Sequence, residues 1–389
     1  MGKYQKKKQL ILVFHDFTTE HLGKDVFLVP YYMGKELDVN VKICYPRRRN
    51  NTNLPKEYRG VVLEPFYCPE TIGLKYYYPI FAILWIIRHY KEIDILVLFH
   101  FFYRTMLITH LFRCLNKNAL LYVKLDIPTF VVNSIDQRIK RNKLLAFLYK
   151  SFAKKVNFFS CETSEVLDSI KKSRMFSLVK YKLYLMPNGF DDVYLNDIGM
   201  EVLPYYRKDN AMLTVGRLGS QQKNTEMFLK SIEHLSASGW NYYFIGTIES
   251  SFQKYIDKYF EKNPQLKKYV HFLGSIQDKR ELWEYYNKSK VFVLTSRWES
   301  YGLVLNEAAR FGNYIVSTAV GAAPDILSET KFGCFVADDD SEGLAKVLSS
   351  VQESNMLCAD KANPDLSWAH YIHKLLDDAK NNITFNCMC

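Results

Sequence analysis

Short apolar runs rich in β-branched residues alternate with longer helical patterns along most of the chain. Strands that alternate with helices form parallel sheets covered by helices on both faces. The first series of expected strands is Leu10–Phe14, Val39–Cys44, Ile93–Phe99, Ala119–Lys124, Lys155–Ser160 and Leu183–Met186. The second series is Met212–Val215, Tyr242–Ile245, Val270–Leu273, Val291–Leu294, Tyr314–Ser317 and Cys334–Val336. The sequence therefore predicts the α/β class with two Rossmann-like sheets.

A turn and a polar stretch divide the two series. Pro187-Asn188-Gly189 is a strong turn signal, and we interpret the polar residues 191–210 as a linker. This division predicts an N-terminal domain over residues 1–190, to which a C-terminal helical segment over residues 367–389 returns, and a second domain over residues 208–366. Doubly wound sheets bind ligands at the carboxyl ends of their strands. If the two crevices face each other, the ligand lies between the domains.

Charge is divided unevenly between the two halves. Residues 1–190 carry 31 Lys and Arg against 15 Asp and Glu, whereas residues 191–389 carry 21 against 26. A basic half predicts an anionic partner, such as lipid head groups, a phosphorylated acceptor or nucleic acid. The first apolar run is too short for a signal peptide, and no run is long enough to span a membrane. We therefore expect a cytoplasmic protein, attached at most to the inner face of the cell membrane.

One segment of the second domain has the pattern of a phosphate site. A buried strand leads through the polar loop 295–302 into the helix Leu303–Phe311. The backbone N–H groups of Tyr301, Gly302 and Leu303 then lie at a helix N-terminus, which attracts phosphate, and the glycine lets the backbone come close to a ligand.

Two carboxylates flank this expected phosphate site. Glu299 lies in the loop, and Glu307 lies eight residues later, beyond the first turn of the helix. Carboxylates accept strong hydrogen bonds from hydroxyl groups. One of the two suits a sugar ring and the other a ribose diol.

A second strand end supplies two cations. The strand Met212–Val215 ends at Gly216 and Arg217, and Lys223 precedes a helix. Arg217 and Lys223 would project from one strand end into the same crevice. Fixed cations at such a place stabilise a departing diphosphate, which is a large catalytic effect. The pair would take the role that a metal ion has in other enzymes.

We expect neither a bound metal nor a cofactor. The eight cysteines form no CxxC pair and have no histidine cluster at zinc spacing. Asp338-Asp339-Asp340 has the form Asp-x-Asp, but it follows a late strand in a surface-like loop, and we therefore do not interpret it as a metal site.

Together these residues resemble the signature of glycosyltransferase family 4, whose members have the GT-B architecture of two facing Rossmann-like domains. Glu299 and Glu307 match the E-x7-E motif, and Gly216-Arg217 with Lys223 matches the donor-phosphate motif. Further matches are the base-binding strand and loop Val270–Ser275, the turn Met186–Asp191 and the start of the last helix at Ser367-Trp368. The resemblance covers about residues 185–370, and the motifs occur in the family's order.

The resemblance implies a retaining, metal-independent hexosyltransferase or related enzyme with an oxocarbenium-like transition state. It would move a sugar from a UDP- or GDP-sugar to a hydroxyl of a saccharide or lipid-linked acceptor, in surface polysaccharide or glycolipid biosynthesis. Arg217 and Lys223 would bind the diphosphate, and Glu299 would bind the sugar hydroxyls. The implied donor-binding residues are Gly216, Gly274, Ser275, Ile276, Ser300, Tyr301, Gly302, Leu303 and Glu307, of which Glu307 holds the ribose and residues 274–276 hold the base.

The first domain departs from the family pattern. Only Gly23 represents the glycine-rich loop that often follows the first strand of the family. The family's His-Asp pair is here Lys124-Leu125-Asp126, so the Asp is kept and the His is lost. Asp126 is therefore the acceptor-side catalytic candidate, and His100, at the end of another expected strand, is the alternative.

Two other classes of function stay open. A GT-B-type nucleotide-sugar epimerase would use the same donor site without an acceptor. A basic nucleic-acid-binding protein would use interleaved basic and aromatic residues, which Arg138–Lys155 supplies. The intact donor motif argues against both, and we expect no nucleic acid partner. The same stretch fits an amphipathic helix packed on the first sheet or an interfacial membrane helix.

Overall fold

The computed structural model describes residues 7–69, 78–173, 179–235, 239–353 and 364–382. The chain divides into two compact units, one of residues 1–189 with 367–389 and one of residues 190–366. In the described parts of the chain, no helix is both long enough and apolar enough to cross a membrane.

The first unit is built on a sheet of eight strands in the order β3-β4-β2-β1-β5-β6-β7-β8. The strands are β1 (Gln9–Val13), β2 (Asn40–Pro46), β3 (Glu57–Tyr58), β4 (Val61–Phe66), β5 (Ile95–Phe99), β6 (Leu120–Leu125), β7 (Phe158–Cys161) and β8 (Leu183–Leu185). Among the described strands of this sheet, only β3 pairs antiparallel with its neighbour, β4. The parallel order reverses between β1 and β5, which pair with each other.

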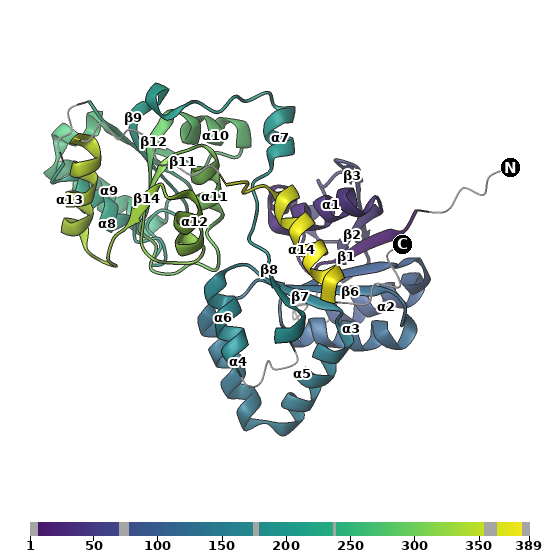
Figure 1. The fold of residues 1–389 in the computed structure, drawn as a ribbon. Helices are drawn as coiled ribbons and strands as arrows, with labels where there is room; N and C mark the ends of the chain where they lie inside the picture. Colours follow the sequence, from purple (N-terminus) through teal and green to yellow (C-terminus); the bar gives the residue numbers. More distant parts are fainter. Residues whose placement is uncertain (1–6, 70–77, 174–178, 236–238, 354–363, 383–389) are drawn as a thin grey trace. The chain divides into compact units, whose positions relative to one another are not determined.

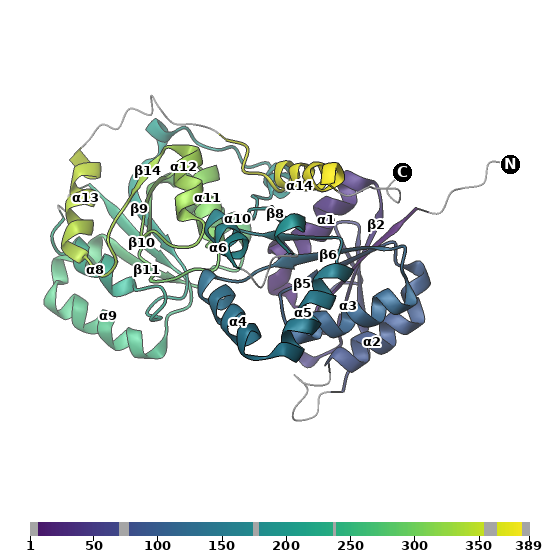
Figure 2. The same ribbon diagram turned by 60° about the horizontal axis from the view of Figure 1, so that its bottom comes forward.

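Helices cover both faces of this sheet (Figure 1). They are α1 (Asp25–Leu37), α2 (Tyr78–His89), α3 (Tyr103–Leu115), α4 (Thr129–Arg141), α5 (Lys143–Lys155), α6 (Ser164–Lys172) and α14 (Trp368–Asn382). The 3₁₀ helices are η1 (Thr19–Gly23), η2 (Arg49–Asn51), η3 (Tyr90–Glu92) and η4 (Lys180–Lys182). Helices α2 to α6 share one apolar core with the sheet, whereas α1 and α14 pack together on the other face (Figure 2).

Alternation along β6 separates the two faces of the first sheet. Leu121, Val123 and Leu125 pack into the core shared with α2 to α6. Because successive side chains of a strand point to opposite faces, Lys124 points toward α1, and its ammonium group contacts Asp25 at the start of that helix.

The second unit contains six parallel strands in the order β11-β10-β9-β12-β13-β14. They are β9 (Asp209–Val215), β10 (Asn241–Ile245), β11 (Val270–Gly274), β12 (Ser289–Leu294), β13 (Tyr314–Ser317) and β14 (Gly333–Phe335). The helices are α7 (Asp192–Asp197), α8 (Thr225–Ile232), α9 (Ser250–Lys262), α10 (Lys279–Lys288), α11 (Leu303–Arg310), α12 (Ala323–Thr330) and α13 (Ser341–Glu353), with 3₁₀ helices η5 (Tyr205–Arg207) and η6 (Pro264–Lys268). This strand order is that of a Rossmann sheet.

Both faces of the second sheet are buried. Met212 and Val291 pack in a core with α8, α9 and α13, whereas their neighbours Leu213 and Phe292 pack in a second core with α10, α11 and α12. A parallel sheet buried on both faces requires the continuous apolar runs seen in the sequence. The predicted α/β class with two Rossmann-like sheets is confirmed.

Two local expectations were wrong, and two strands were not expected. The stretch 191–210 is not a plain linker, because α7 and η5 lie in it and β9 begins at Asp209. The stretch Arg138–Lys155 is not one helix, since α4 ends at Arg141 and α5 begins at Lys143. Asn142 separates the two with an extended backbone and caps α5 by accepting from the Leu145 N–H at 3.0 Å. The strands β3 and β4 were not expected.

Candidate functional site

The strand order of the second unit reverses between β9 and β12, which pair in parallel. A doubly wound sheet opens a crevice at such a point, beyond the carboxyl ends of the two strands. The loop after β9 carries Gly216, Arg217 and Lys223, and the loop after β12 carries Glu299. The fold therefore brings the residues predicted for the diphosphate and the sugar to one place.

An ion pair joins these two loops. Lys223 Nζ donates to Glu299 Oε1 at 2.5 Å, and only 17% and 7% of the two side chains are exposed. Ser296 Oγ donates to the same carboxylate oxygen at 2.6 Å. A Cβ atom at Gly216 would lie 3.1 Å from Lys223 Cε. The glycine therefore leaves the space that the lysine needs to reach the carboxylate.

Gln222 connects the two cationic positions to the carboxylate. Its Oε1 accepts from Arg217 Nη2 at 2.9 Å, and its Nε2 donates to Glu299 Oε2 at 3.3 Å and to the Trp298 carbonyl at 2.9 Å. Gln222 was not among the residues predicted for this site. Its position next to Lys223 was visible, but the contact with Glu299 spans 77 positions of the chain.

Further hydrogen bonds fix the two loops against each other. Thr295 Oγ1 donates to the carbonyls of Lys223 at 3.1 Å and Asn224 at 3.0 Å, and the Arg297 N–H donates to the Gln222 carbonyl at 2.8 Å. Loops held by this many bonds keep their charged groups in place before a ligand binds, which is the requirement for electrostatic stabilisation of a transition state.

Helix α11 begins beside this pair, as the phosphate-site pattern predicted. Gly302 caps the helix with φ 90°, a left-handed conformation that favours glycine. Ser300, Tyr301 and Leu303 flank it, and the Tyr301 side chain is buried. The first backbone N–H groups of a helix are free to donate to an anion. The arrangement is suited to a phosphate group.

Gly321 supports the same loop from beneath. A Cβ atom at Gly321 would lie 2.4 Å from the Tyr301 carbonyl oxygen and 2.8 Å from Glu299 Cβ. The Ala322 N–H donates to the Tyr301 carbonyl at 2.8 Å. The backbone of residues 321–322 therefore packs directly against the loop that positions Glu299.

Glu307 lies on α11, facing α10. Trp283 Nε1 donates to Glu307 Oε1 at 3.1 Å, and Lys279 Nζ lies 3.9 Å from the same oxygen and 4.8 Å from the centre of the Trp283 ring. Burial raises the pKa of Tyr286 well above its ordinary value, and the Glu307 carboxylate adds to this effect. Glu307 is thus a partly buried acceptor with one donor already in place.

The predicted base-binding loop follows β11. Gly274 has φ 70°, and its carbonyl accepts from the Gly246 N–H at 2.7 Å. Gln277 Nε2 donates to Ser275 Oγ at 2.7 Å, and Ile276 packs on the core beneath α10. A Cβ atom at Gly246 would lie 1.7 Å from the Gly216 carbonyl oxygen. The ends of β9, β10 and β11 therefore approach each other closely.

Asp339 and Asp340 have structural contacts. Arg297 Nη2 donates to Asp339 Oδ1 at 2.6 Å, and Asn224 Nδ2 donates to the same oxygen at 2.9 Å. The bond from Arg297 lowers the pKa of Asp339. Asp340 Oδ1 accepts from the Gly343 N–H at the start of α13 at 2.8 Å. These contacts attach the loop after β14 to both donor-side loops.

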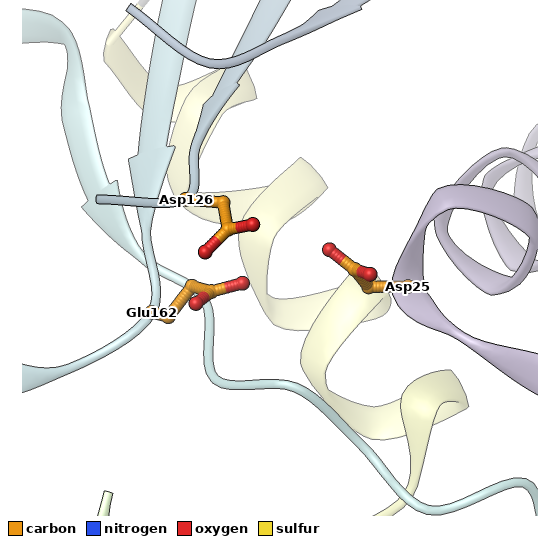
Figure 3. Close-up of side chains that lie close together, drawn as sticks. All are labelled: Asp25, Asp126 and Glu162. Atoms are coloured by element: carbon orange, nitrogen blue, oxygen red, sulfur yellow. The ribbon is translucent and has the colours of Figure 1, made fainter. Parts of the chain in front are cut away.

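Three carboxylates converge in the first unit, where Asp25, Asp126 and Glu162 point toward one another (Figure 3). Lys124 Nζ donates to Asp25 Oδ2 at 2.9 Å and also to Glu162 Oε1. The lysine side chain is fully buried. Its ammonium group is the cation that the carboxylates surround. The sequence carried one signal for this cluster, a lysine inside an apolar strand. A buried charge requires charged or polar partners, so the lysine indicated that carboxylates lie nearby.

The cluster has unusual proton affinities. Burial alone would lower the pKa of Lys124, but the Asp25 and Glu162 carboxylates raise it above its ordinary value. Burial raises the pKa of Glu162 to about 8. Asn188 Nδ2 donates to Glu162 Oε1 at 3.0 Å. Glu162 was missed because its partners Lys124 and Asn188 lie 38 and 26 positions away in the sequence.

The acceptor-side candidates lie next to this cluster. His100 follows β5, and its Nδ1 lies 3.9 Å from Asp126 Oδ2, so the two alternatives of the sequence analysis are neighbours. His100 has φ 65°, a left-handed conformation that is uncommon for a residue with a side chain. Gly23 ends η1, two residues before Asp25 begins α1.

Comparison with known proteins gives a match of part of the chain to a family model, and a fold. Residues 209–354 match the family model described as "Glycosyl transferases group 1". An "Uncharacterized 41.2 kDa protein in cps region" of Klebsiella pneumoniae is 29% identical over 140 residues, which are 36% of each chain. The amylovoran biosynthesis glycosyltransferase AmsD of Erwinia amylovora is 32% identical over 127 residues, which are 32% of this chain and 30% of that protein. The match thus spans about a third of the length of these relatives.

Solved glycosyltransferases share the fold over nearly the whole chain. A glycosyltransferase from Rickettsia africae has a TM-score of 0.67 at 15% identity, with 97% of this chain and 99% of that one covered. The lipopolysaccharide outer core galactosyltransferase WaaB has a TM-score of 0.65 at 13% identity, with 95% and 98% covered. HepE of Anabaena, solved with UDP and glucose, has a TM-score of 0.60 at 13% identity, with 96% and 95% covered. The fold is that of GT-B glycosyltransferases.

Proposed function

We propose that this protein transfers a sugar from a nucleoside diphosphate sugar to an acceptor hydroxyl. The observation that carries the proposal is the Lys223–Glu299 pair beside Arg217 at the point where the strand order of the second sheet reverses. The match of residues 209–354 to a glycosyl transferase family model supports it. The names of the relatives support the same class of reaction, since one is an amylovoran biosynthesis glycosyltransferase.

The donor would be held by the second unit. Arg217, Lys223 and the N–H groups that begin α11 would bind the diphosphate, because they combine fixed positive charge with free donors. Glu299 would accept hydrogen bonds from the sugar, and Glu307 would accept them from the ribose. Residues 274–276 would contact the base through their backbone. UDP is the nucleotide we favour, since HepE was solved with UDP.

The finer chemistry follows the family 4 resemblance. We propose that the hexosyl group is transferred with retention through an oxocarbenium-like transition state. Arg217 and Lys223 would stabilise the departing diphosphate in place of a metal ion. On the acceptor side, Asp126 would accept the hydrogen bond of the attacking hydroxyl, with His100 placed beside it at 3.9 Å.

Surface polysaccharide assembly is the biological role we favour. Two relatives carry names of this kind, the protein of a cps region and the amylovoran biosynthesis enzyme. The acceptor would be a saccharide or a lipid-linked saccharide. We also propose peripheral attachment to the anionic inner face of the cell membrane through the basic first unit, with the protein otherwise in the cytoplasm.

A binding screen tests the donor assignment. Thermal unfolding would be followed with UDP, GDP and ADP and with their sugars, because a ligand that binds only the folded state raises the apparent stability. We expect stabilisation by one nucleotide, which Arg217→Gln abolishes. Stabilisation by none, or full stabilisation of the variant, would contradict the proposal. Conversion of the donor sugar to an epimer without an acceptor would instead favour the epimerase.

A further inference from the structure

A pocket of about 280 Å³ lies in the first unit where the order of its parallel strands reverses. Its walls come from the carboxyl ends of β1 and β5 and from the first turns of α2 and α3. Most of the lining is aliphatic or aromatic, including Val13, Phe14, Leu98 and Ile108. Ligand pockets usually measure about 300–1,000 Å³. This pocket is therefore sized for one segment of a larger ligand.

The polar part of the lining is cationic or neutral and contains no carboxylate. Arg104 is half-buried, lies over the Tyr103 ring and donates to the Tyr103 hydroxyl at 3.1 Å. Among the described residues, no carboxylate lies within ion-pair distance of Arg104. Burial and the neighbouring His100 lower the pKa of His15 to about 4, and Arg104 adds to the effect. His15 is thus neutral at pH 7, and Arg104 is the lining residue with a permanent positive charge.

Apolar side chains lead out of the pocket onto the surface. Phe102 and Tyr103 line the pocket and are also 50% and 49% exposed. Leu107 lies one turn further along α3 and is 51% exposed. Helix α2 packs against α3 and exposes Ile80 and Leu84 at helical spacing. Exposed apolar groups on neighbouring helices beside a pocket suit a contact with an apolar partner.

The pocket also communicates with the acceptor-side candidates. His100 lines it and lies 3.9 Å from the carboxylate of Asp126. His100 has a left-handed backbone with φ 65°, and such conformations are concentrated at functional sites.

We propose that this pocket binds the junction between the apolar chain and the phosphate of a lipid-linked acceptor. The phosphate contacts Arg104, the first carbons of the chain fill the apolar pocket, and the rest of the chain leaves past Phe102 and Tyr103 over α3 and α2. The proposal rests on the proposed glycosyl transfer and names the class of acceptor. The proposal explains why Arg104 lies in a pocket whose lining is mostly aliphatic or aromatic.

Isothermal titration calorimetry of the full chain with geranyl phosphate tests the proposal. We expect geranyl phosphate to bind at least ten-fold more tightly than geraniol, inorganic phosphate or glucose 1-phosphate. Arg104→Gln should weaken the binding of geranyl phosphate at least ten-fold. Arg88→Gln removes an exposed cation of α2 outside the pocket and should leave this affinity unchanged. Phe102→Ala, at the exposed rim of the pocket, should weaken the binding of geranyl phosphate without changing the binding of inorganic phosphate.

UDP binding by the same preparation separates the two proposals. If UDP binds and geranyl phosphate does not, the assignment of this pocket to a lipid phosphate is wrong and the donor site stands. The same conclusion follows if UDP binds and Arg104→Gln binds geranyl phosphate as tightly as the wild type does. Tighter binding of glucose 1-phosphate than of geranyl phosphate would also overturn it, in favour of a soluble acceptor. If UDP does not bind either, the glycosyl transfer itself is in question.

Discussion

At the scale of residues, the two loops proposed to bind the nucleotide sugar meet at one carboxylate, which accepts hydrogen bonds from several side chains. Glu299 receives hydrogen bonds from Lys223, Ser296 and Gln222, and it is 7% exposed. These bonds fix its two oxygens before any sugar arrives. A residue positioned in this way costs little further reorganisation when it binds a ligand.

Glu299→Gln should lower kcat/KM by about 10²–10³-fold, the usual effect of removing one preorganised electrostatic partner. The amide keeps the shape of the side chain but removes the charge that Lys223 faces at 2.5 Å. Steady-state kinetics with the preferred donor would measure the loss, and circular dichroism would check the fold. Glu284→Gln, at an exposed acid of α10, is the matched control and should keep full activity. Wild-type turnover by Glu299→Gln would remove the donor-site assignment.

The buried cluster of the first unit should make stability depend on pH. Burial raises the pKa of Glu162 to about 8 in the folded protein, above the ordinary value of 4.5. Between these two values the carboxyl group of Glu162 binds more protons in the folded state than in the unfolded state, so the contribution of Glu162 to stability falls as the pH rises from about 5 to 8. Lys124 does not contribute in this window because its pKa is raised above an already high value.

In Glu162→Gln, the decrease in unfolding free energy that Glu162 causes between pH 5 and pH 8 should therefore be absent. Urea unfolding at several pH values would measure it. Glu165→Gln, at an exposed acid of α6, should keep the wild-type dependence. The same dependence of stability on pH in the wild type and in Glu162→Gln would show that Glu162 is ionised in the folded state.

At the scale of elements, the sequence predicted the donor-side loops because their information is local. Arg217 and Glu299 lie within a few residues of strand ends, and a parallel sheet gathers those ends at one edge. The strand β4 was missed because Val61–Phe66 contains Glu64 and Pro65. The structure shows why the strand forms: Lys42 Nζ and Trp85 Nε1 donate to the Glu64 carboxylate at 2.6 Å and 2.8 Å.

The acceptor side was less predictable because its contacts join residues that lie far apart in the sequence. Lys124 has partners 99 positions before it and 38 positions after it. Such pairs depend on strand order, which a single sequence does not specify. The break at Asn142 was missed because the amphipathic pattern continues through it, although asparagine is a common residue at the start of a helix. Local patterns thus predicted elements and loops, but not the contacts between distant elements.

Gly321→Ala tests the packing beneath the donor loop. The new Cβ would lie 2.4 Å from the Tyr301 carbonyl, and the residue would also keep φ 55°. Gly199→Ala is the matched control, because Gly199 has φ 63° but nothing within 4 Å of an added Cβ. We expect Gly199→Ala to cost about 1 kcal/mol from the backbone alone, and Gly321→Ala to cost a further 1–3 kcal/mol or so from overpacking. Urea unfolding would measure both.

Gly321→Ala should also weaken donor binding, since the loop that the new Cβ would displace carries Glu299. Calorimetric titration with the preferred nucleotide should show weaker binding to Gly321→Ala than to Gly199→Ala. Equal affinity and equal stability of the two variants would mean that the loop does not depend on this close packing.

At the scale of the whole molecule, the uneven charge of the chain has a structural location. Helices α2 to α5 contain ten Lys and Arg residues and a single acidic residue, Asp136. Lys140 Nζ lies 2.7 Å from the Asp136 carboxylate. On α5, Leu144, Phe147 and Leu148 are 68%, 66% and 41% exposed, at spacings that place them on one face. Cations around exposed apolar groups are the pattern of a surface that binds anionic lipid.

We therefore expect the full chain to sediment with vesicles that contain anionic lipid and to remain in solution with neutral ones. Each Lys or Arg near an anionic surface contributes about 1 kcal/mol, so neutralising Arg138, Lys140, Arg141 and Lys143 together should abolish binding at low salt. Neutralising Lys254, Lys258, Lys267 and Lys268, exposed lysines of the second unit, removes the same charge and should leave binding unchanged. Replacing Leu144 and Phe147 by serine should weaken binding at every salt concentration, whereas the charge contribution alone declines as salt rises. If both charge variants lose binding equally, net charge and not this face is responsible. If the wild type ignores anionic vesicles at low salt, the basic first unit serves a different anionic partner.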